Sequence, residues 1–173
     1  MSKANETMRF SVIIPTYNRV TKLRQCVESL LAQDVDPEQY EIIVVNDGSA
    51  DGTTDYVRSL RGDRRVRLIE IPNSGPARAR NRGTQLAEGS ILAFTDDDCT
   101  CPPAWLRDLE RAMQATNAVA VGGVVQNRIM ENDLTRVYEE TNRYLAQKIN
   151  EEEGKARFLT TNNFAVLRSM LRQ

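Results

Sequence analysis

Apolar positions along residues 9–127 follow two periods in turn, one typical of strands and the other typical of helices. Short apolar, β-branched runs predict strands over 9–15, 41–48, 66–71, 90–95 and 118–127. Apolar residues at helical spacing predict helices over 19–33, 53–60, 75–89 and 103–116. We expect Pro15 to end the first strand, and Pro76 and Gly89 to mark the ends of the third helix. This alternation predicts an α/β fold, with a mainly parallel sheet and helices on both of its faces.

The alternation ends near residue 131. An apolar stripe at helical spacing predicts a long amphipathic helix over 132–149, and a charged stretch follows it. The segment FLTTNNFAVLRS, 158–169, comes next, and we expect a helix to begin just before the last residue, Gln173. Residues 1–8 form a polar leader that we expect to be disordered, and this leader lacks the apolar core of a signal peptide.

Polar side chains follow three of the predicted strands at the points where those strands end. Because the carboxyl ends of parallel strands meet at one edge of a sheet, where ligands bind, we expect a shared rim. Its members are Thr16, Tyr17 and Asn18 after the first strand, Asn46 and Asp47 after the second, and Asp96, Asp97 and Asp98 after the fourth.

Three consecutive carboxylates at the end of a buried strand repel one another, which raises the question of what neutralises them. The chain has no histidine, so a histidine metal site or a Ser-His-Asp triad within it is excluded. Hard carboxylate oxygens suit Mg²⁺ or Mn²⁺, which substrate phosphates would complete. A solvated acidic turn is the alternative, and the metal interpretation is favoured. We interpret Cys26, Cys99 and Cys101 as ordinary thiols.

The segment SGPARARNRG places a helix N-terminus, which favours anions, beside several arginines. Alternate residues cannot all face one way on a helix, so we choose Arg78, in the first turn, to point into the cleft. A basic surface helix accounts for Arg80 and Arg82. Asp47 could accept a hydrogen bond from a base N–H or a ribose hydroxyl, or form an Asp-Gly turn. Tyr17 could stack on a base or pack over the sheet.

Composition narrows the function classes. The net charge of −1, from 23 basic and 24 acidic residues, gives no basic footprint, so we expect no nucleic-acid partner. The longest apolar runs are strand-sized and shorter than a membrane span. Three cysteines without a paired framework suit a reducing cytoplasm.

Four motifs in order, VIIPTYNR, VVNDGSADGT, SGPARARNRG and ILAFTDDDC followed by PPAWL, resemble the nucleotide-binding half of family 2 glycosyltransferases. The resemblance implies a single-domain GT-A (Rossmann-like) α/β fold. It implies a donor-binding region over 9–130 and a partial acceptor-side region of the same domain over 131–173, where TTNNFAVLRS is similar to an acceptor-side segment.

The resemblance also implies roles for the rim residues. Asp96 would face the ribose and Asp98 would bind the divalent ion in a DXD motif, while Asp97 takes the inner role in another register. Arg78 would lie by the base or the diphosphate. The remaining nucleotide-sugar contacts implied are Pro15, Thr16, Tyr17, Asn18, Asp47 and Gly75.

The implied reaction is an inverting, metal-dependent transfer from a nucleoside-diphosphate sugar to a saccharide or lipid-linked hydroxyl. UDP is the default carrier, with dTDP and GDP as alternatives, and Mn²⁺ or Mg²⁺ is the implied cofactor. The resemblance implies a cytoplasmic role in surface-polysaccharide or glycolipid synthesis, with which peripheral membrane contact is compatible.

The general base of such enzymes follows the acceptor-side segment, so the resemblance places it beyond Gln173 and implies a C-terminally truncated chain. Glu131 and Asp133 are substitutes that no spacing supports. A non-catalytic nucleotide-sugar-binding or interaction module therefore stays open as an alternative. A receiver-like protein is disfavoured because the first strand ends without a carboxylate. A sugar nucleotidyltransferase is disfavoured because no Gly-rich loop follows that strand.

Overall fold

The computed structural model describes residues 8–126 and 159–171, together with residues 137, 140, 141 and 144. Its strands are β1 (Phe10–Thr16), β2 (Tyr40–Asn46), β3 (Val66–Glu70), β4 (Ile91–Phe94), β5 (Ala120–Gly122) and β6 (Phe164–Leu167). Its α-helices are α1 (Val20–Leu31), α2 (Thr53–Ser59), α3 (Pro76–Leu86) and α4 (Trp105–Thr116). Two 3₁₀-helices are η1 (Pro37–Gln39) and η2 (Arg168–Met170). Every strand and helix predicted between residues 9 and 127 is present.

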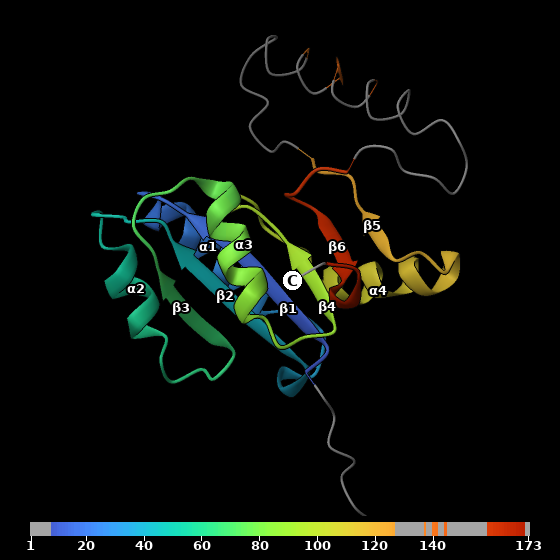
Figure 1. Cartoon of the computed structure of the whole chain (residues 1–173), viewed down its shortest axis with the longest axis horizontal. Helices are drawn as coiled ribbons and strands as arrows, with labels where there is room; N and C mark the ends of the chain where they lie inside the picture. Colours follow the sequence, from blue (N-terminus) through green and yellow to red (C-terminus); the bar gives the residue numbers. More distant parts are fainter. Residues whose placement is uncertain (1–7, 127–136, 138–139, 142–143, 145–158, 172–173) are drawn as a thin grey trace, which may run out of the picture.

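The strands form one sheet in the order β3-β2-β1-β4-β6-β5 (Figure 1). β1 pairs in parallel with β2 and β4, and β2 pairs in parallel with β3. β6 runs antiparallel to both β4 and β5. The sheet is therefore mainly parallel, as the sequence predicts, with a mixed edge that the sequence did not predict.

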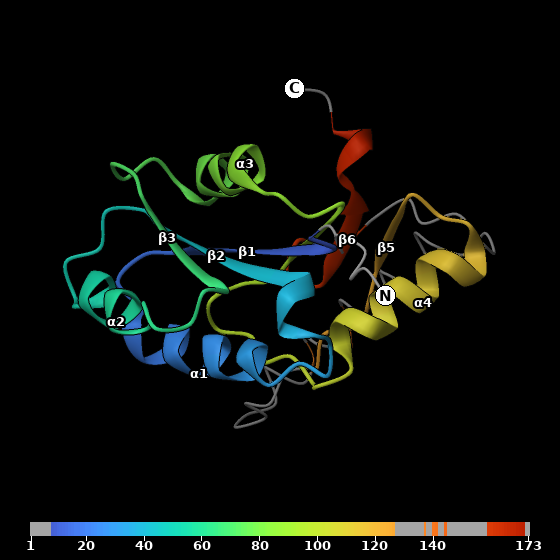
Figure 2. The same cartoon turned by 90° about the horizontal axis from the view of Figure 1, so that it is seen from below.

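The chain's direction across the sheet decides where the helices lie. From β1 through β2 to β3 it moves one way, and it then returns across β1 to form β4. Because crossovers between parallel strands are right-handed, this reversal puts α3 on the opposite face from α1 and α2. Figure 2 shows α3 on one face and α1, α2 and α4 on the other. The reversal makes the gap between the carboxyl ends of β1 and β4 the switch point of the sheet, where such folds bind ligands.

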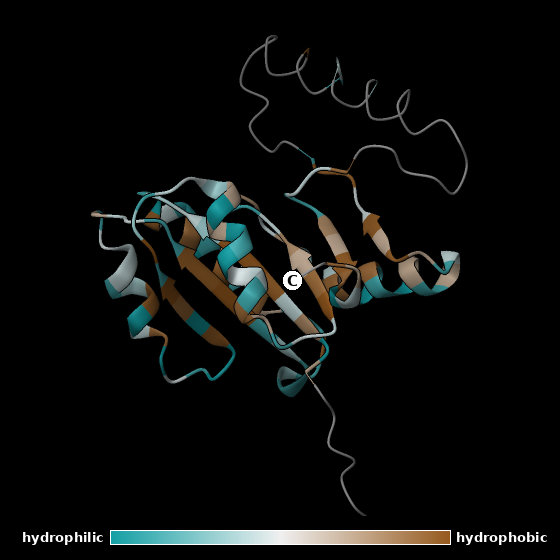
Figure 3. Cartoon of the chain, viewed as in Figure 1, coloured by the Kyte–Doolittle hydropathy of each residue, from teal (hydrophilic) through white to brown (hydrophobic). Residues whose placement is uncertain are grey.

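Strand periodicity sends alternate side chains into two cores. On β1, Phe10, Val12 and Ile14 pack in the cluster beneath α1, α2 and α4. Ile13 faces the other way, into a smaller cluster that includes Ala79 of α3. Both faces of the central strands are apolar (Figure 3), as expected where helices cover a parallel sheet on both sides.

A glycine lets α3 approach the sheet closely. A Cβ at Gly83 would lie 2.6 Å from Ile13 Cγ2 and 3.1 Å from Val45 Cγ2. Helix interiors disfavour glycine, so close packing is the physical reason for this residue. The contact fixes α3, and hence its N-terminal end, relative to β1 and β2.

The expectation that Pro15 ends the first strand is wrong, because β1 continues to Thr16. Pairing of β1 with β4 ends at Ile13 and Phe94, while pairing with β2 runs on to Thr16 and Asn46. The Ile13 carbonyl accepts from the backbone N–H of Thr95, so Pro15, two residues on, also faces β4's side. β4 has ended there, and the missing proline N–H costs no ladder hydrogen bond.

Some expectations for the two ends of the chain differ from the structure, and others lie outside the described residues. A strand, β6, precedes Gln173, followed by η2, whereas we expected a helix to begin there. The predicted helix 132–149, the substitutes Glu131 and Asp133, and nearly all of the 1–8 leader lie outside the described residues. Within the part of the chain that the structure describes, no helix is long and apolar enough to cross a membrane.

Candidate functional site

A side-chain hydrogen bond joins the two strand ends that flank the switch point. The Thr16 hydroxyl, at the end of β1, donates to Asp97 Oδ2, just after β4, over 2.8 Å. Both residues are buried, with Asp97 4% exposed. The expected meeting of these two strand ends at one rim is confirmed.

Burial decides the electrostatics of Asp97. Loss of solvent raises the pKa of this carboxyl, because a charged group is disfavoured away from water. The Thr16 hydroxyl and the Arg19 guanidinium act in the opposite direction, without outweighing burial. The Arg19 contact spans 3.3 Å, from Nη1 to Asp97 Oδ1.

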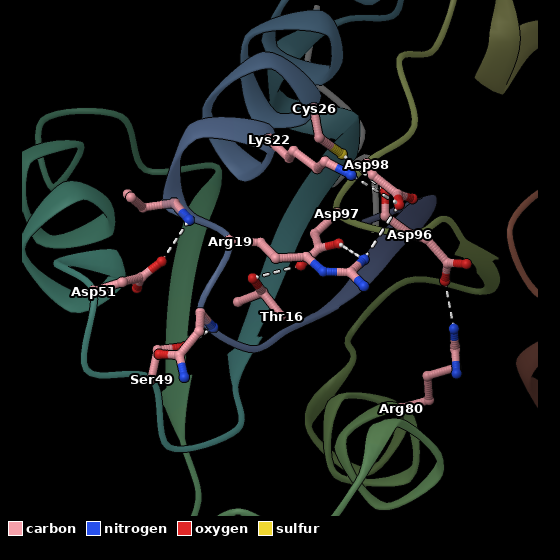
Figure 4. Close-up of polar contacts among 12 residues, drawn as sticks. Thr16, Arg19, Lys22, Cys26, Ser49, Asp51, Arg80, Asp96, Asp97 and Asp98 are labelled. Carbon is pink, nitrogen blue, oxygen red and sulfur yellow. Dashed lines mark hydrogen bonds and ion pairs between the residues drawn. The ribbon is translucent and has the colours of Figure 1, made fainter. Parts of the chain in front are cut away.

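The two neighbouring carboxylates, Asp96 and Asp98, contact different cations (Figure 4). Asp96 accepts from Arg80, which reaches it from α3. Asp98 lies 3.2 Å from Arg19 Nη1 and 3.7 Å from Lys22 Nζ, both from the start of α1. In this structure, the acidic triplet is therefore neutralised by three basic side chains from two helices.

The loop between β1 and α1 is held by the loop between β2 and α2. Asn18 adopts a left-handed conformation with φ of 52°, which asparagine tolerates. Its backbone N–H donates to Ser49 Oγ over 2.9 Å, and its side-chain oxygen accepts from the Ala50 N–H over 2.8 Å. Asp51 caps α1 by accepting from the Val20 N–H over 2.8 Å. Tyr17 is 48% exposed beside this bridge.

Asp47 organises the entrance to α3. Its two carboxylate oxygens accept from the backbone N–H groups of Ser74, over 2.7 Å, and Gly75, over 2.8 Å. Gly75 precedes α3 with φ of 89°, a conformation that favours glycine. A carboxylate oxygen has a second lone pair, so this role leaves acceptor capacity for a ligand.

The interpretation of Arg80 as an ordinary surface residue is wrong. Its side chain is 18% exposed and its guanidinium bonds Asp96, while its buried Nε has no hydrogen-bond partner among the residues that the structure describes. Arg78 is exposed in the first turn of α3. Arg80 lies directly after Ala79 and three residues before Gly83, both of which face the sheet. That spacing is the sequence signal that could have placed Arg80 at the rim.

Arg19 and Lys22 are also site residues that the sequence analysis did not single out. They are three residues apart, so on α1 they lie on the same face. Arg19 comes directly after the left-handed Asn18, which turns the chain into α1. A pair of basic residues at the start of the first helix was the available signal.

The cysteines lie around the acidic turn as thiols. Cys26 donates to the Asp96 carbonyl oxygen over 3.5 Å, and Cys101 donates to Thr95 Oγ1 over 3.9 Å. Burial raises the pKa of Cys101 to about 12, and it also raises the pKa of Cys26. Metal ligands must be thiolates, so this chemistry favours a structural role for both residues.

The donor set fits a divalent ion that substrate helps to hold. Within the described residues, no group of three or more acidic or cysteine side chains is arranged to enclose a metal ion. Mg²⁺ and similar ions need no such cage, because they keep several waters and use one or two carboxylates plus substrate phosphates. Asp98 offers an accessible carboxylate, 38% exposed, whose partners Arg19 and Lys22 are long, flexible cations.

Comparison with known proteins gives a family match over almost the whole chain. The model of Glycosyl transferase family 2 matches residues 11–173. The glycosyltransferase AglE of Haloferax volcanii is 37% identical over 118 residues, which cover 67% of this chain and 39% of AglE.

Solved structures agree with that match. S. aureus TarS 1–349 in complex with UDP-GlcNAc has a TM-score of 0.62 at 28% identity, covering 72% of this chain and 39% of TarS 1–349. The mannosyltransferase PcManGT from Pyrobaculum calidifontis, in complex with GDP-Man and Mn²⁺, has a TM-score of 0.72 at 24% identity. That likeness covers 93% of this chain and 45% of PcManGT, and it shows the fold. The chain thus spans less than half of the length of each of these proteins.

Proposed function

The chain belongs to glycosyl transferase family 2 and has the GT-A fold, and we propose that it takes part in sugar transfer from a nucleoside-diphosphate sugar to a hydroxyl acceptor. The observation that carries the proposal is the division of the acidic triplet. Asp97 is turned inward onto Thr16, whereas Asp96 and Asp98 are accessible at the switch point. This division favours the register in which Asp96 faces the ribose and Asp98 binds the divalent ion.

A UDP-sugar is the proposed donor. The solved TarS structure, at 28% identity, holds UDP-GlcNAc, which supports uridine as the base in this chain too. We propose that the base binds against the end of β1 and the exposed ring of Tyr17, with Asp47 nearby at the entrance to α3. A saccharide or lipid-linked acceptor, reached in the cytoplasm or at a membrane surface, is proposed on the resemblance alone.

Asp98 would hold the divalent ion, Mn²⁺ or Mg²⁺, with Asp96 beside it. Such an ion would offset the negative charge that grows on the departing diphosphate. The chain's own residues supply further positive potential. The N-terminal end of α3 favours anions, and the Arg80 guanidinium, which contacts Asp96, adds positive charge beside the acidic triplet.

The proposed reaction breaks the bond between the anomeric carbon and the diphosphate oxygen and forms a bond from that carbon to the acceptor oxygen. The electron pair of the broken bond leaves with the nucleoside diphosphate. Attack from the opposite face inverts the anomeric centre, and the acceptor proton passes to a general base. We assign no described residue to that role.

Calorimetric titration tests the donor site. We expect one of UDP, GDP or dTDP to bind in a Mn²⁺-dependent manner, with UDP binding best. Asp98→Asn should weaken this binding at least about tenfold, because it removes a charged ligand. Asp108→Asn, an exposed change on α4, is the matched control and should have no effect.

Two results would count against the proposal. Absence of Mn²⁺-dependent binding for all three nucleotides contradicts the donor site, as does full binding by the Asp98 variant. Nucleotide-sugar binding without transfer to any of a panel of acceptors would favour the alternative of a non-catalytic binding module.

A further inference from the structure

One guanidinium lies between two carboxylates of the acidic triplet. Arg19 Nη1 is 3.3 Å from Asp97 Oδ1 and 3.2 Å from Asp98 Oδ2 (Figure 4). These two carboxylates differ in their exposure to solvent and in their other contacts. Asp97 is buried and fixed by Thr16, whereas the side chain of Asp98 is 38% exposed.

Arg19 therefore occupies the carboxylate to which the proposed function assigns the divalent ion. A guanidinium and a divalent cation repel each other, so both cannot bind the same Asp98 oxygen at full strength. An ion that binds Asp98 Oδ2 would displace Arg19 from that oxygen. It need not separate Arg19 from Asp97, because that carboxylate faces inward.

The backbone of Arg19 stays in place during such an exchange. Arg19 is the N-cap residue of α1, and the loop between β2 and α2 holds the residues on either side of it, Asn18 and Val20. Its side chain, in contrast, is 52% exposed and can swing. A guanidinium released from Asp98 yet tethered to Asp97 would remain within the acidic turn, beside the bound ion.

We propose that Arg19 is a further donor-binding residue, which neutralises Asp98 when no divalent ion is bound and moves to the donor's diphosphate when the ion takes Asp98. The inference rests on the proposed function. Arginine suits the exchange, because its planar fork can contact a carboxylate and a phosphate at once. Lys22, a point charge 3.7 Å from Asp98, adds potential without contacting Asp97.

The exchange makes Arg19 weaken the binding of Mn²⁺ and strengthen the binding of UDP. Without nucleotide, Arg19 competes with Mn²⁺, so Arg19→Gln should tighten Mn²⁺ binding about three- to tenfold. With saturating Mn²⁺, the same variant lacks a diphosphate contact and should bind UDP about three- to tenfold more weakly. A residue that merely shaped the site would weaken both.

Electron paramagnetic resonance of free Mn²⁺ measures the first affinity and calorimetry with UDP measures the second. Arg24→Gln is the matched control, since it removes the same charge from α1 but lies over the Tyr56 ring, 4.3 Å from its centroid. It should change neither affinity by more than about twofold. Arg19→Lys keeps the charge and should restore most of the competition with Mn²⁺.

Several results overturn the inference. The inference fails if Arg19→Gln binds Mn²⁺ no more tightly than the unaltered chain. It also fails if neither protein binds Mn²⁺ detectably, because Arg19 is then not what excludes the ion. If the unaltered chain binds UDP with Mn²⁺ in these cases, only this inference fails. If the unaltered chain binds no UDP at saturating Mn²⁺, the proposed function fails with it.

Discussion

The Thr16 hydroxyl donates a 2.8 Å hydrogen bond to Asp97 and thereby ties the end of β1 to the turn after β4. The two residues are 81 positions apart in the chain, and both are buried. The bond spans the point where the strands stop pairing and the sheet opens. The bond lies on the buried side of the candidate site, whereas Asp96 and Asp98 face outward.

Thr16→Val tests the energetic weight of this bond. Valine keeps the shape of threonine but leaves a buried carboxylate short of a donor, so we expect the free energy of unfolding to fall by about 1–3 kcal/mol. Urea denaturation at neutral pH measures the change. Thr21→Val, an exposed substitution on α1, is the control and should stay within about 0.5 kcal/mol of the unaltered protein. Equal stabilities of the two variants would contradict the structural role.

A second prediction concerns pH and a part of the molecule remote from the acidic triplet. The Arg65 side chain donates to both oxygens of Asp63, which lowers the pKa of that carboxyl below 3.8, against the opposing effect of burial. A carboxyl with a lowered folded-state pKa contributes stability above its unfolded value and loses it as the pH falls through the folded value.

Asp63→Asn should therefore lower the free energy of unfolding by about 0.5–1.5 kcal/mol at pH 7. The difference from the unaltered protein should shrink as the pH falls below 3.8. Urea denaturation across acidic and neutral pH measures it, with Glu28→Gln on α1 as the control. A difference that is constant over the whole range would show that the charge of Asp63 is not its cause.

Local pattern was sufficient for much of the fold because each central element carries its own signal. β1 and β2 are apolar runs of strand length, and α1 buries Leu23, Cys26, Val27 and Leu30 at helical spacing. The rim followed from the same pattern, since Thr16, Asp47 and Asp97 lie at or close after the ends of predicted strands.

What the sequence did not predict depends on contacts between distant residues. β6 is only four residues long and is defined by antiparallel pairing with β4, which is remote in the chain. The contacts of Arg80 with Asp96 and of Arg19 with Asp98 depend on how closely two helices approach one strand end. The spacing of Arg80 from Ala79 and Gly83 indicates the face of α3 on which it lies, but neither contact distance is encoded in local periodicity, and Arg78 in the first turn was preferred.

Gly83→Ala tests the close approach of α3. Its Cβ would meet Ile13 Cγ2 at 2.6 Å, and the neighbouring core is packed, so we expect a loss of about 1–3 kcal/mol. The higher helix propensity of alanine returns up to about 1 kcal/mol of this loss. Gly62→Ala is the control, because a Cβ there meets no atom within 4 Å. Urea denaturation should rank Gly83→Ala as clearly the less stable variant, and the reverse ranking would contradict the packing argument.

The two arginines of α3 offer a direct comparison within one helix. Arg80 bonds Asp96 and keeps a buried Nε that has no hydrogen-bond partner within the described residues, whereas Arg78 is exposed. Arg80→Gln should therefore weaken Mn²⁺-dependent UDP binding by about tenfold, as expected for a lost charge-assisted hydrogen bond. Arg78→Gln, with the same change in charge, should weaken it by less than about threefold, through long-range potential alone. Calorimetry on both variants decides between the two positions: an equal or larger effect at Arg78 would return the diphosphate contact to the first turn of α3, where the sequence placed it.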